Sequence, residues 1–305
     1  MKNVSSIDYI FLISLSAIWG SSFTLIKFSI DTIPPSLLTF IRLFIASIFL
    51  IIYIKYKTNF LILEKKYLRK IVVIAVLGNV IPFNLIGWSE NHVDSINAAA
   101  LIGTMPLFTF LISHFLKYGE KLNTRIVIGL FMGFLGMYLL LRNTLNPTAS
   151  NFNLTNLSNF LIVLASICYA FSANFIKDIK NLSPIQIATS TTIVATIISL
   201  PIFLLTYKFS FIEIQQVLTS ISAKSLFSSL FLGFMCNAIA VTIFFKLIQK
   251  QSAGFASQSN FFIPCFGILW SFIFLDESLS NIFLFSTTLI VLGVIFVHKG
   301  RKKFN

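Results

Sequence analysis

The chain has 305 residues, of which 56% are hydrophobic and only 11% charged, and its mean hydropathy is +0.89. Soluble domains carry roughly 25% charged residues, so this composition excludes a water-soluble globular protein. The net charge of +13 would favour nucleic-acid binding in a soluble protein, but here the basic residues lie in loops between apolar runs, where membrane orientation explains them. We therefore expect no nucleic-acid partner. The three cysteines lie inside apolar runs without metal-ligand spacing, so we expect no disulfide framework, metal site or cofactor.

Ten apolar runs of about 20 residues are each long enough to cross a bilayer core of about 30 Å. The sequence therefore predicts an all-α integral membrane protein with ten transmembrane helices. The predicted spans are residues 7–27, 35–55, 70–89, 95–116, 123–142, 157–177, 184–206, 225–246, 253–275 and 280–298. The first run is too long for the apolar region of a signal peptide, so we expect it to be retained as a helix.

The basic residues predict how the chain is oriented. With the N-terminus in the cytoplasm, 18 of the 23 Lys and Arg residues fall in cytoplasmic segments, four in outer segments and one, Arg42, within a span. The positive-inside rule therefore places both termini in the cytoplasm. We expect a multi-pass protein of the inner (plasma) membrane, with the lipid bilayer as its surroundings.

The chain carries the same kind of helical hairpin twice, at residues 98–141 and at residues 254–297. Each copy contains a proline, a glutamate and a glycine in the same order, which are Pro106, Glu120 and Gly136 in the first and Pro264, Glu277 and Gly293 in the second. The proline precedes the glutamate by 14 residues in the first copy and by 13 in the second, and the glycine follows the glutamate by 16 in both. This matching order indicates a duplicated membrane unit.

The duplication extends towards the openings of the two halves. Trp19 pairs with Tyr169 at an offset of 150 residues, and Gly78 pairs with Gly233 at an offset of 155. With five spans in each half, the halves must cross the membrane in opposite directions. The sequence therefore predicts two inverted five-helix repeats and a linker between them, at residues 1–142, 157–305 and 143–156 respectively.

Several short motifs resemble those of the EamA-type proteins of the drug/metabolite transporter superfamily. They are AIWGSSF at 17–23, FIRL at 40–43, SINA at 95–98 and GE at 119–120, together with the prolines and glycines of the hairpins. The resemblance covers essentially the whole chain and implies a ten-helix carrier that moves small metabolites by alternating access. It also implies that the hairpin glutamate marks the fold and does not bind substrate. Because the family has many substrates, the resemblance leaves the cargo open.

Arg42 is the one basic residue that the prediction places within a span. A guanidinium near mid-membrane costs roughly 2.5–3.5 kcal/mol on insertion scales, so it needs a reason to be there. One interpretation is a counter-charge that faces a cavity and holds a carboxylate or phosphate. The other is a structural residue whose head satisfies helix carbonyls near the membrane interface. The sequence leaves both open.

Amides and aromatic rings inside the spans are the other candidates for substrate contact. An amide in hydrocarbon needs a hydrogen-bond partner, which is either a neighbouring helix or a polar cavity. The resemblance implies a cavity lined by the first, third and fourth helices and their counterparts in the second half. The candidate substrate-binding residues are therefore Trp19, Arg42, Asn79, Asn84, Trp88, Asn97, Tyr169, Asn174, Asn237, Gln258 and Asn260.

Prolines and glycines inside the spans predict local packing. Pro106 and Pro264 each free a backbone carbonyl, so we expect them to kink their helices and shape the cavity. Gly129, Gly133 and Gly136 in the fifth predicted span permit close approach of another helix. We expect packing within the bundle, and a homodimer contact is the alternative left open.

The sequence contains no arrangement typical of an enzyme, because it lacks a Ser/His/Asp set, a His/Cys cluster and a phosphate-binding loop. No Asp or Glu lies in the middle of a predicted span, which favours facilitated diffusion or exchange over a buried carboxylate relay. We therefore predict a transporter of small polar metabolites, with amino acids or related solutes as the first substrate class and export as a direction to consider. The alternatives are an exporter of drugs or cationic compounds and a membrane receptor that does not transport.

Overall fold

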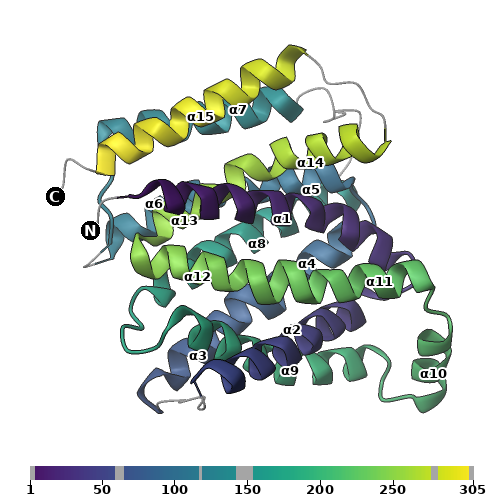
Figure 1. Ribbon diagram of the computed structural model, residues 1–305. Coiled ribbons are helices and arrows are strands. Elements are labelled where there is room, and N and C mark those ends of the chain that lie inside the picture. The colour runs from purple at the N-terminus through teal and green to yellow at the C-terminus, as the bar shows by residue number, and fades with distance from the viewer. Residues whose placement is uncertain (1–3, 59–64, 117–118, 142–153, 276–280, 302–305) are drawn as a thin grey trace.

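In the computed structural model the chain is a bundle of helices packed side by side (Figure 1). The structure describes residues 4–58, 65–116, 119–141, 154–275 and 281–301. Most of the predicted linker at 143–156 therefore lies outside the described residues, as does the turn at Asp276 and Glu277. The described part of the chain contains helices and no strand.

The helices follow one another closely in both halves. In the first half they are α1 (Ser6–Ile30), α2 (Pro35–Thr58), η1 (Lys65–Tyr67), α3 (Leu68–Ala75), η2 (Val76–Val80), α4 (Ile81–Ser89), α5 (Ser95–Ile102), α6 (Met105–Phe115) and α7 (Thr124–Leu141). In the second half they are α8 (Leu154–Ile176), α9 (Pro184–Thr206), α10 (Phe211–Thr219), α11 (Ala223–Phe231), η3 (Leu232–Ile239), α12 (Ala240–Lys250), α13 (Ala253–Ser257), α14 (Ser259–Leu275) and α15 (Asn281–Arg301). η1 is a short 3-10 helix, whereas η2 and η3 are π-helical segments.

Every predicted span coincides with one helix or with two or three consecutive ones. Among the described residues, eight stretches of helix are long and apolar enough to cross a membrane, and Thr124–Leu139 is a shorter apolar helix. The predicted class of an all-helical membrane protein is therefore confirmed. The short helix α10 is an addition to the prediction, because it falls in the stretch at 207–224, which was expected to be a connection.

Local sequence signals determine where several helices begin. Pro184 opens α9, and the backbone N–H of Ser183 just before it donates to Gln186 Oε1 at 2.8 Å. In return, Ser183 Oγ accepts from the Gln186 N–H at 3.4 Å, so two backbone donors are satisfied by this capping box. Pro35 opens α2 in a similar way, since the first turn of a helix does not use the N–H that proline lacks.

The bundle is apolar on its outer surface and carries hydroxyl groups inside. Phe44, Ile48 and Ile52 of α2 are all exposed. Ser47 on the same helix is buried, and its hydroxyl lies 2.9 Å from that of Thr196 on α9. Because lipid offers no hydrogen-bond partners, apolar side chains outside and paired hydroxyls inside are what a membrane protein requires.

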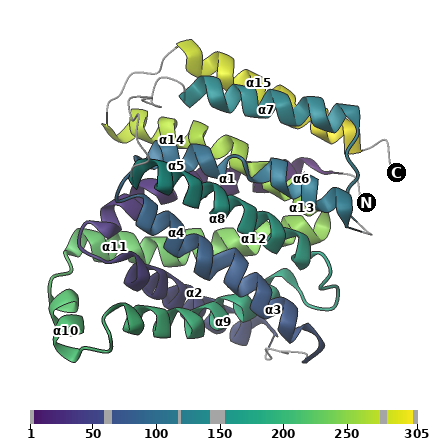
Figure 2. The ribbon, with the colours of Figure 1, turned by 180° about the vertical axis from the view of Figure 1, so that it is seen from behind.

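Two helix pairs lie at opposite edges of the bundle. α7 and α15 lie side by side along one edge, and α2 and α9 along the other (Figure 1, Figure 2). A Cβ atom on Gly129 would lie 2.6 Å from the carbonyl oxygen of Gly293, and one on Gly136 would lie 2.7 Å from that of Ser286. These glycines therefore let α7 and α15 approach closely, which confirms the prediction of packing within the bundle.

Candidate substrate-binding cavity

Two helices at the centre of the bundle are interrupted by π-helical segments. η2 contains Gly78 and η3 contains Gly233, the two glycines that pair in the sequence repeat. Pro82 follows η2 and has no backbone N–H to donate to the preceding turn, which favours a change of hydrogen-bond pattern there. Because π segments occur frequently at functional sites, this pair of segments points to the middle of the bundle.

The fourth and ninth predicted spans are each divided into two helices. α5 ends at Ile102 and α6 begins at Met105, with Pro106 in its first turn. In the second half, α13 and α14 meet at Gln258, while Pro264 lies inside α14. A kink was expected at each proline; the fourth span is instead divided at Gly103 and Thr104, just before Pro106, and the ninth at Gln258, before Pro264.

A cavity lies among these interrupted helices and contains about 750 Å³ of empty space, its opening included. Its wall is built from α1, α2, η2, α4, α5, α6, α8, η3, α12 and α14, so both halves of the chain contribute. Six of the eleven predicted substrate-binding residues line it, namely Trp19, Arg42, Asn79, Tyr169, Asn237 and Asn260.

Arg42 is a buried cation on the cavity wall, with only 6% of its surface exposed. Its Nη2 donates to Asn237 Oδ1 at 2.7 Å, and its guanidinium carbon lies 3.9 Å from the centre of the Phe83 ring. Gly233 permits this contact between α2 and η3, because a Cβ atom there would lie 2.9 Å from the carbonyl oxygen of Arg42. None of the ion pairs among the described residues involves Arg42.

Three asparagines bring amide groups to the wall of the cavity. Asn79 belongs to η2 and Asn237 to η3, and both are almost fully buried. Asn260 opens α14, where its Nδ2 donates to the carbonyl oxygen of Ser257 at 2.9 Å. Each π segment therefore contributes one amide to the cavity, and the break between α13 and α14 contributes a third.

Aromatic rings form another part of the wall. The indole N–H of Trp19 donates to the carbonyl oxygen of Cys236 at 3.1 Å, which joins α1 to η3. The Trp19 ring centre lies 5.1 Å from that of Phe244 on α12, and Tyr169 of α8 also lines the cavity. The cavity thus combines aromatic surface with the polar groups of Arg42 and the asparagines.

Two of the predicted amides lie away from the cavity lining and hold helices instead. Asn84 Nδ2 donates to the carbonyl oxygen of Val80 on its own helix at 2.8 Å. Asn174 Nδ2 donates at 3.2 Å to the carbonyl oxygen of Thr109, which links α8 to α6. Both contacts are of the kind that stabilises helices in a membrane.

The other three predicted residues are also outside the cavity lining. The Trp88 ring lies 4.7 Å from that of His92, one turn further along the chain. Gln258 Nε2 donates to the carbonyl oxygen of Gly254 at 3.2 Å. Asn97 Oδ1 is buried and has no hydrogen-bond partner in the part of the chain that the structure describes.

The lining also includes residues that the sequence analysis did not propose as substrate contacts. Ser22 and Ser172 are two of them, and they pair at the same offset of 150 residues as Trp19 and Tyr169. The internal repeat was therefore a signal that could have identified both serines. Phe83 has no such signal, because nothing in the sequence distinguishes it from the other phenylalanines among the 35 in the chain.

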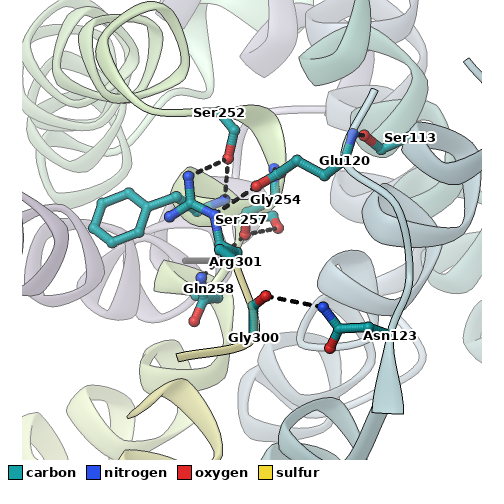
Figure 3. Close-up of polar contacts among 10 residues, drawn as sticks. Ser113, Glu120, Asn123, Ser252, Gly254, Ser257, Gln258, Gly300 and Arg301 are labelled. Carbon is teal, nitrogen blue, oxygen red and sulfur yellow. Dashed lines mark hydrogen bonds and ion pairs between the residues drawn. The ribbon is translucent and has the colours of Figure 1, made fainter. Parts of the chain in front are cut away.

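A second buried arginine, Arg301, is the last residue of α15, and Figure 3 shows it among its polar neighbours. Its Nε donates to Glu120 Oε1 at 2.5 Å, and its Nη2 donates to Ser252 Oγ at 3.0 Å. Glu120 Oε2 also accepts from the backbone N–H of Gly254 at 3.2 Å. Glu120 therefore has the structural role that the resemblance implies, and it ties α15 to the connection between α12 and α13.

Asp8 holds the same connection from the first turn of α1. Its carboxylate accepts from Lys250 Nζ at 2.6 Å and from Gln251 Nε2 at 3.0 Å. The connection between α12 and α13 is thus held by α1, by α15 and by the turn after α6. This end of the bundle is held together by ion pairs, whereas Arg42 on the cavity wall forms none with the described residues.

Comparisons with known proteins identify the family of the chain. The model of the EamA-like transporter family matches residues 6–142 and, a second time, residues 156–298. A solved crystal structure superposes with a TM-score of 0.75 at 15% sequence identity and covers 98% of this chain and 99% of that chain. The fold is therefore shared with a protein of very different sequence.

Several curated proteins are similar over nearly their whole length. The "Uncharacterized transporter YoaV" of Bacillus subtilis is 25% identical, over 93% of this chain and 94% of its own. The "S-adenosylmethionine/S-adenosylhomocysteine transporter" of Chlamydia muridarum is 27% identical, over 95% and 91%. "Protein PagO" of Salmonella typhimurium is 26% identical, over 88% and 84%. With its apolar spans and two matches to the family model, this integral membrane protein belongs to the EamA-like transporter family.

Proposed function

We propose that the chain transports small polar metabolites by alternating access and binds them in the central cavity. The observation that supports this most is that both halves of the chain build the cavity wall. Transporters built from repeats bind substrate where the repeats meet, and they expose the site to either side by rocking one part against the other. In this proposal residues 1–142 and 157–305 are two inverted five-helix repeats.

Corresponding features of the two halves support the inverted repeat. The π segments η2 and η3 contain the paired glycines Gly78 and Gly233, and each lies next to the cavity. The edge pairs also combine one helix from each half, α2 with α9 and α7 with α15. A duplicated unit in opposite orientations would produce both kinds of correspondence.

Alternating access requires that each end of the bundle be able to open. The network around Arg301 and Glu120 is the contact that would have to loosen, or move as one piece, at the end where α15 ends. We place this end in the cytoplasm of a cell with this protein in its inner (plasma) membrane, because the positive-inside rule assigns both termini to that side.

Amino acids and related solutes are the substrate class that we propose first. The cavity offers one cation, several amides and aromatic rings, which together suit a small molecule with a charged group and an apolar part. S-adenosylmethionine and S-adenosylhomocysteine, which appear in the name of the Chlamydia muridarum relative, both carry an amino-acid group. We propose export as the direction to test first.

Counterflow in proteoliposomes tests the proposal. Vesicles preloaded with an unlabelled amino acid should accumulate the labelled form transiently, whereas vesicles without protein should not. Lys70→Gln serves as a control, since Lys70 pairs with Asp178 at an exposed position away from the cavity. Ligand binding without counterflow for any solute would contradict transport and favour a membrane receptor.

An exporter of cationic compounds is the second candidate. The rings of Trp19 and Tyr169 could bind a cation through their faces. The buried charge of Arg42 opposes this, because like charges in a site of low dielectric constant repel strongly. Counterflow confined to quaternary ammonium compounds would therefore favour the second candidate over amino acids.

A further inference from the structure

We propose that Arg42 and Asn237 together bind a carboxylate group of the transported molecule. The inference rests on the proposed function and names the chemical group that the cavity recognises. It joins one residue from each half of the chain, since Arg42 lies on α2 and Asn237 on η3. Binding of substrate would therefore connect the two halves directly.

The first observation is a pair of buried donors that have no partner. Arg42 is 6% exposed and Asn237 is 1% exposed. Within the described residues, neither Arg42 Nε nor Asn237 Nδ2 makes a hydrogen bond. The bond of 2.7 Å between Arg42 Nη2 and Asn237 Oδ1 holds the two side chains together, and both residues line the cavity. A buried N–H without a partner is costly, and an acceptor on the ligand would remove that cost.

The second observation is a positive charge without a counter-charge. The ion pairs seen elsewhere in the described chain use Asp8, Glu120 and Asp178, each with a different cation. Arg42 is in none of them. Taking a cation out of water costs several kcal/mol unless an anion or a set of hydrogen bonds compensates. A ligand carboxylate would supply both the charge and the acceptors.

Phe83 is the aromatic neighbour of Arg42. The ring centre lies 3.9 Å from the guanidinium carbon, within the range of a cation–π contact. Guanidinium N–H groups point outwards in the plane of the group, so they remain able to bind an acceptor at the edge. One guanidinium and one neutral amide match the single charge of a carboxylate better than the charge of about −1.5 to −2 of a phosphate.

A purely structural role for Arg42 accounts for less of what is seen. Joining α2 to η3 through Asn237 uses Nη2 and leaves Nε buried without an acceptor among the described residues, although Arg42 lines the cavity. The wall beyond this pair includes Trp19 and Phe244. We therefore expect a ligand with a carboxylate at one end and an apolar or aromatic body, such as an amino acid with a large apolar side chain.

The test uses compounds that differ only in the carboxylate. Thermal unfolding of the full-length protein in detergent is followed with phenylalanine, phenylalaninamide and phenethylamine, and with methionine and its amide. We expect the amino acids to raise the unfolding temperature of the wild type and of Lys70→Gln, and the amides and the amine to have no such effect. Exposed Lys70 is the matched control for removal of a positive charge.

Asn237→Asp is the decisive variant, because it changes one amide nitrogen into an oxygen. Its carboxylate would take the position of Oδ1, already 2.7 Å from Arg42, and would neutralise the guanidinium from within the protein. We expect the variant to fold and to lose at least about tenfold in affinity for the amino acids, as loss of a charged hydrogen bond implies. Arg42→Gln should show the same loss.

The outcomes separate the inference from the proposed function. If Asn237→Asp keeps the amino-acid response, or if amides stabilise the wild type as well as the acids do, the carboxylate site is wrong even where counterflow continues. If the acids bind and Asn237→Asp abolishes the response, the site is supported, and absence of counterflow would then contradict only transport. Arg42→Lys sharpens the result, because it keeps the charge and loses the planar fork, so we expect a partial loss.

Discussion

Arg42 and Arg301 are the two arginines that the structure describes as buried, with 6% and 5% of their surfaces exposed, yet their surroundings differ. Arg301 is neutralised by Glu120 at 2.5 Å and bonded to Ser252. Arg42 lines the cavity and has an amide and an aromatic ring beside it, but forms no ion pair with a described carboxylate.

The difference lies in charge balance and not in the number of buried nitrogens that lack a partner. Each of the two guanidinium groups has one buried nitrogen without a hydrogen-bond partner among the described residues, Nε in Arg42 and Nη1 in Arg301. Of the two, only Arg301 forms an ion pair with a carboxylate in the part of the chain that the structure describes. A buried cation that the protein itself neutralises is suited to holding segments together, whereas one left unneutralised on a cavity wall is suited to an anionic ligand.

The largest expected effect concerns the paired arginine. Arg301→Gln leaves Glu120 buried without its counter-charge, and breaking a buried pair in this way costs about 3–5 kcal/mol. Denaturant unfolding of the detergent-solubilised protein should therefore show a much lower midpoint. The double variant Arg301→Gln/Glu120→Gln should recover part of the loss, because no stranded charge remains. A wild-type midpoint for Arg301→Gln would contradict the structural role of the pair.

Substitution of Arg42, which forms no ion pair with the described residues, should reduce transport and leave stability nearly unchanged. Arg42→Gln removes a buried charge that forms no ion pair with the described residues. We therefore expect the free energy of unfolding to stay within about 1 kcal/mol of the wild-type value or to rise. Counterflow of amino acids should fall by about tenfold or more, as expected for the loss of a charged hydrogen bond. If Arg42→Gln destabilises the protein as much as Arg301→Gln does, the contrast between the two arginines is lost.

A smaller effect is expected at Glu90. This acid is tested because its charge, when it is ionised, acts on Arg42. Burial raises the pKa of Glu90 well above its ordinary value of 4.5, against the opposing effects of a hydrogen bond from Ser95 and the charges of Lys27 and Arg42. The folded state therefore holds this proton more tightly than the unfolded state. Stability should fall as the pH rises from about 4.5 through the raised pKa.

Glu90→Gln should remove this pH dependence of the unfolding free energy, because the amide does not titrate. We also expect the variant to keep amino-acid counterflow, since a neutral Glu90 does not pair with Arg42 and the proposed transport uses no carboxylate relay. Loss of transport in Glu90→Gln, together with a dependence of wild-type transport on the pH gradient, would show instead that a buried carboxylate drives the carrier.

The smallest effect is expected at an exposed ion pair. Lys70 Nζ lies 3.0 Å from Asp178 Oδ2, and the two side chains are 39% and 53% exposed. Pairs of this kind contribute about 0.2–1 kcal/mol, so Lys70→Gln should shift the unfolding midpoint slightly and leave transport unchanged. A shift as large as that of Arg301→Gln would show that burial is not what separates the ion pairs of this chain.

The helices, the repeat and the role of Glu120 could be predicted from the sequence, because each depends on a local pattern of residues. Apolar runs of about 20 residues predict helices that cross a membrane, and every predicted span coincides with helix. The repeat pairs Gly78 with Gly233, and both glycines lie in π segments beside the cavity. The resemblance implied a structural role for Glu120, and the structure finds its carboxylate paired with Arg301.

The choice among equivalent polar residues was decided by tertiary structure. Asn79 and Asn84 are five residues apart on neighbouring turns, yet only Asn79 lines the cavity, whereas Asn84 bonds to its own helix. No spacing rule distinguishes them, because the outcome depends on how η2 turns the helix and on what packs against it. In the same way, Arg301 meets Glu120 across 181 positions of the chain and Arg42 meets Asn237 across 195. Hydropathy places Arg42 and the asparagines in spans, but only the rotation and packing of whole helices decides which charge finds a partner and which one is left for a ligand.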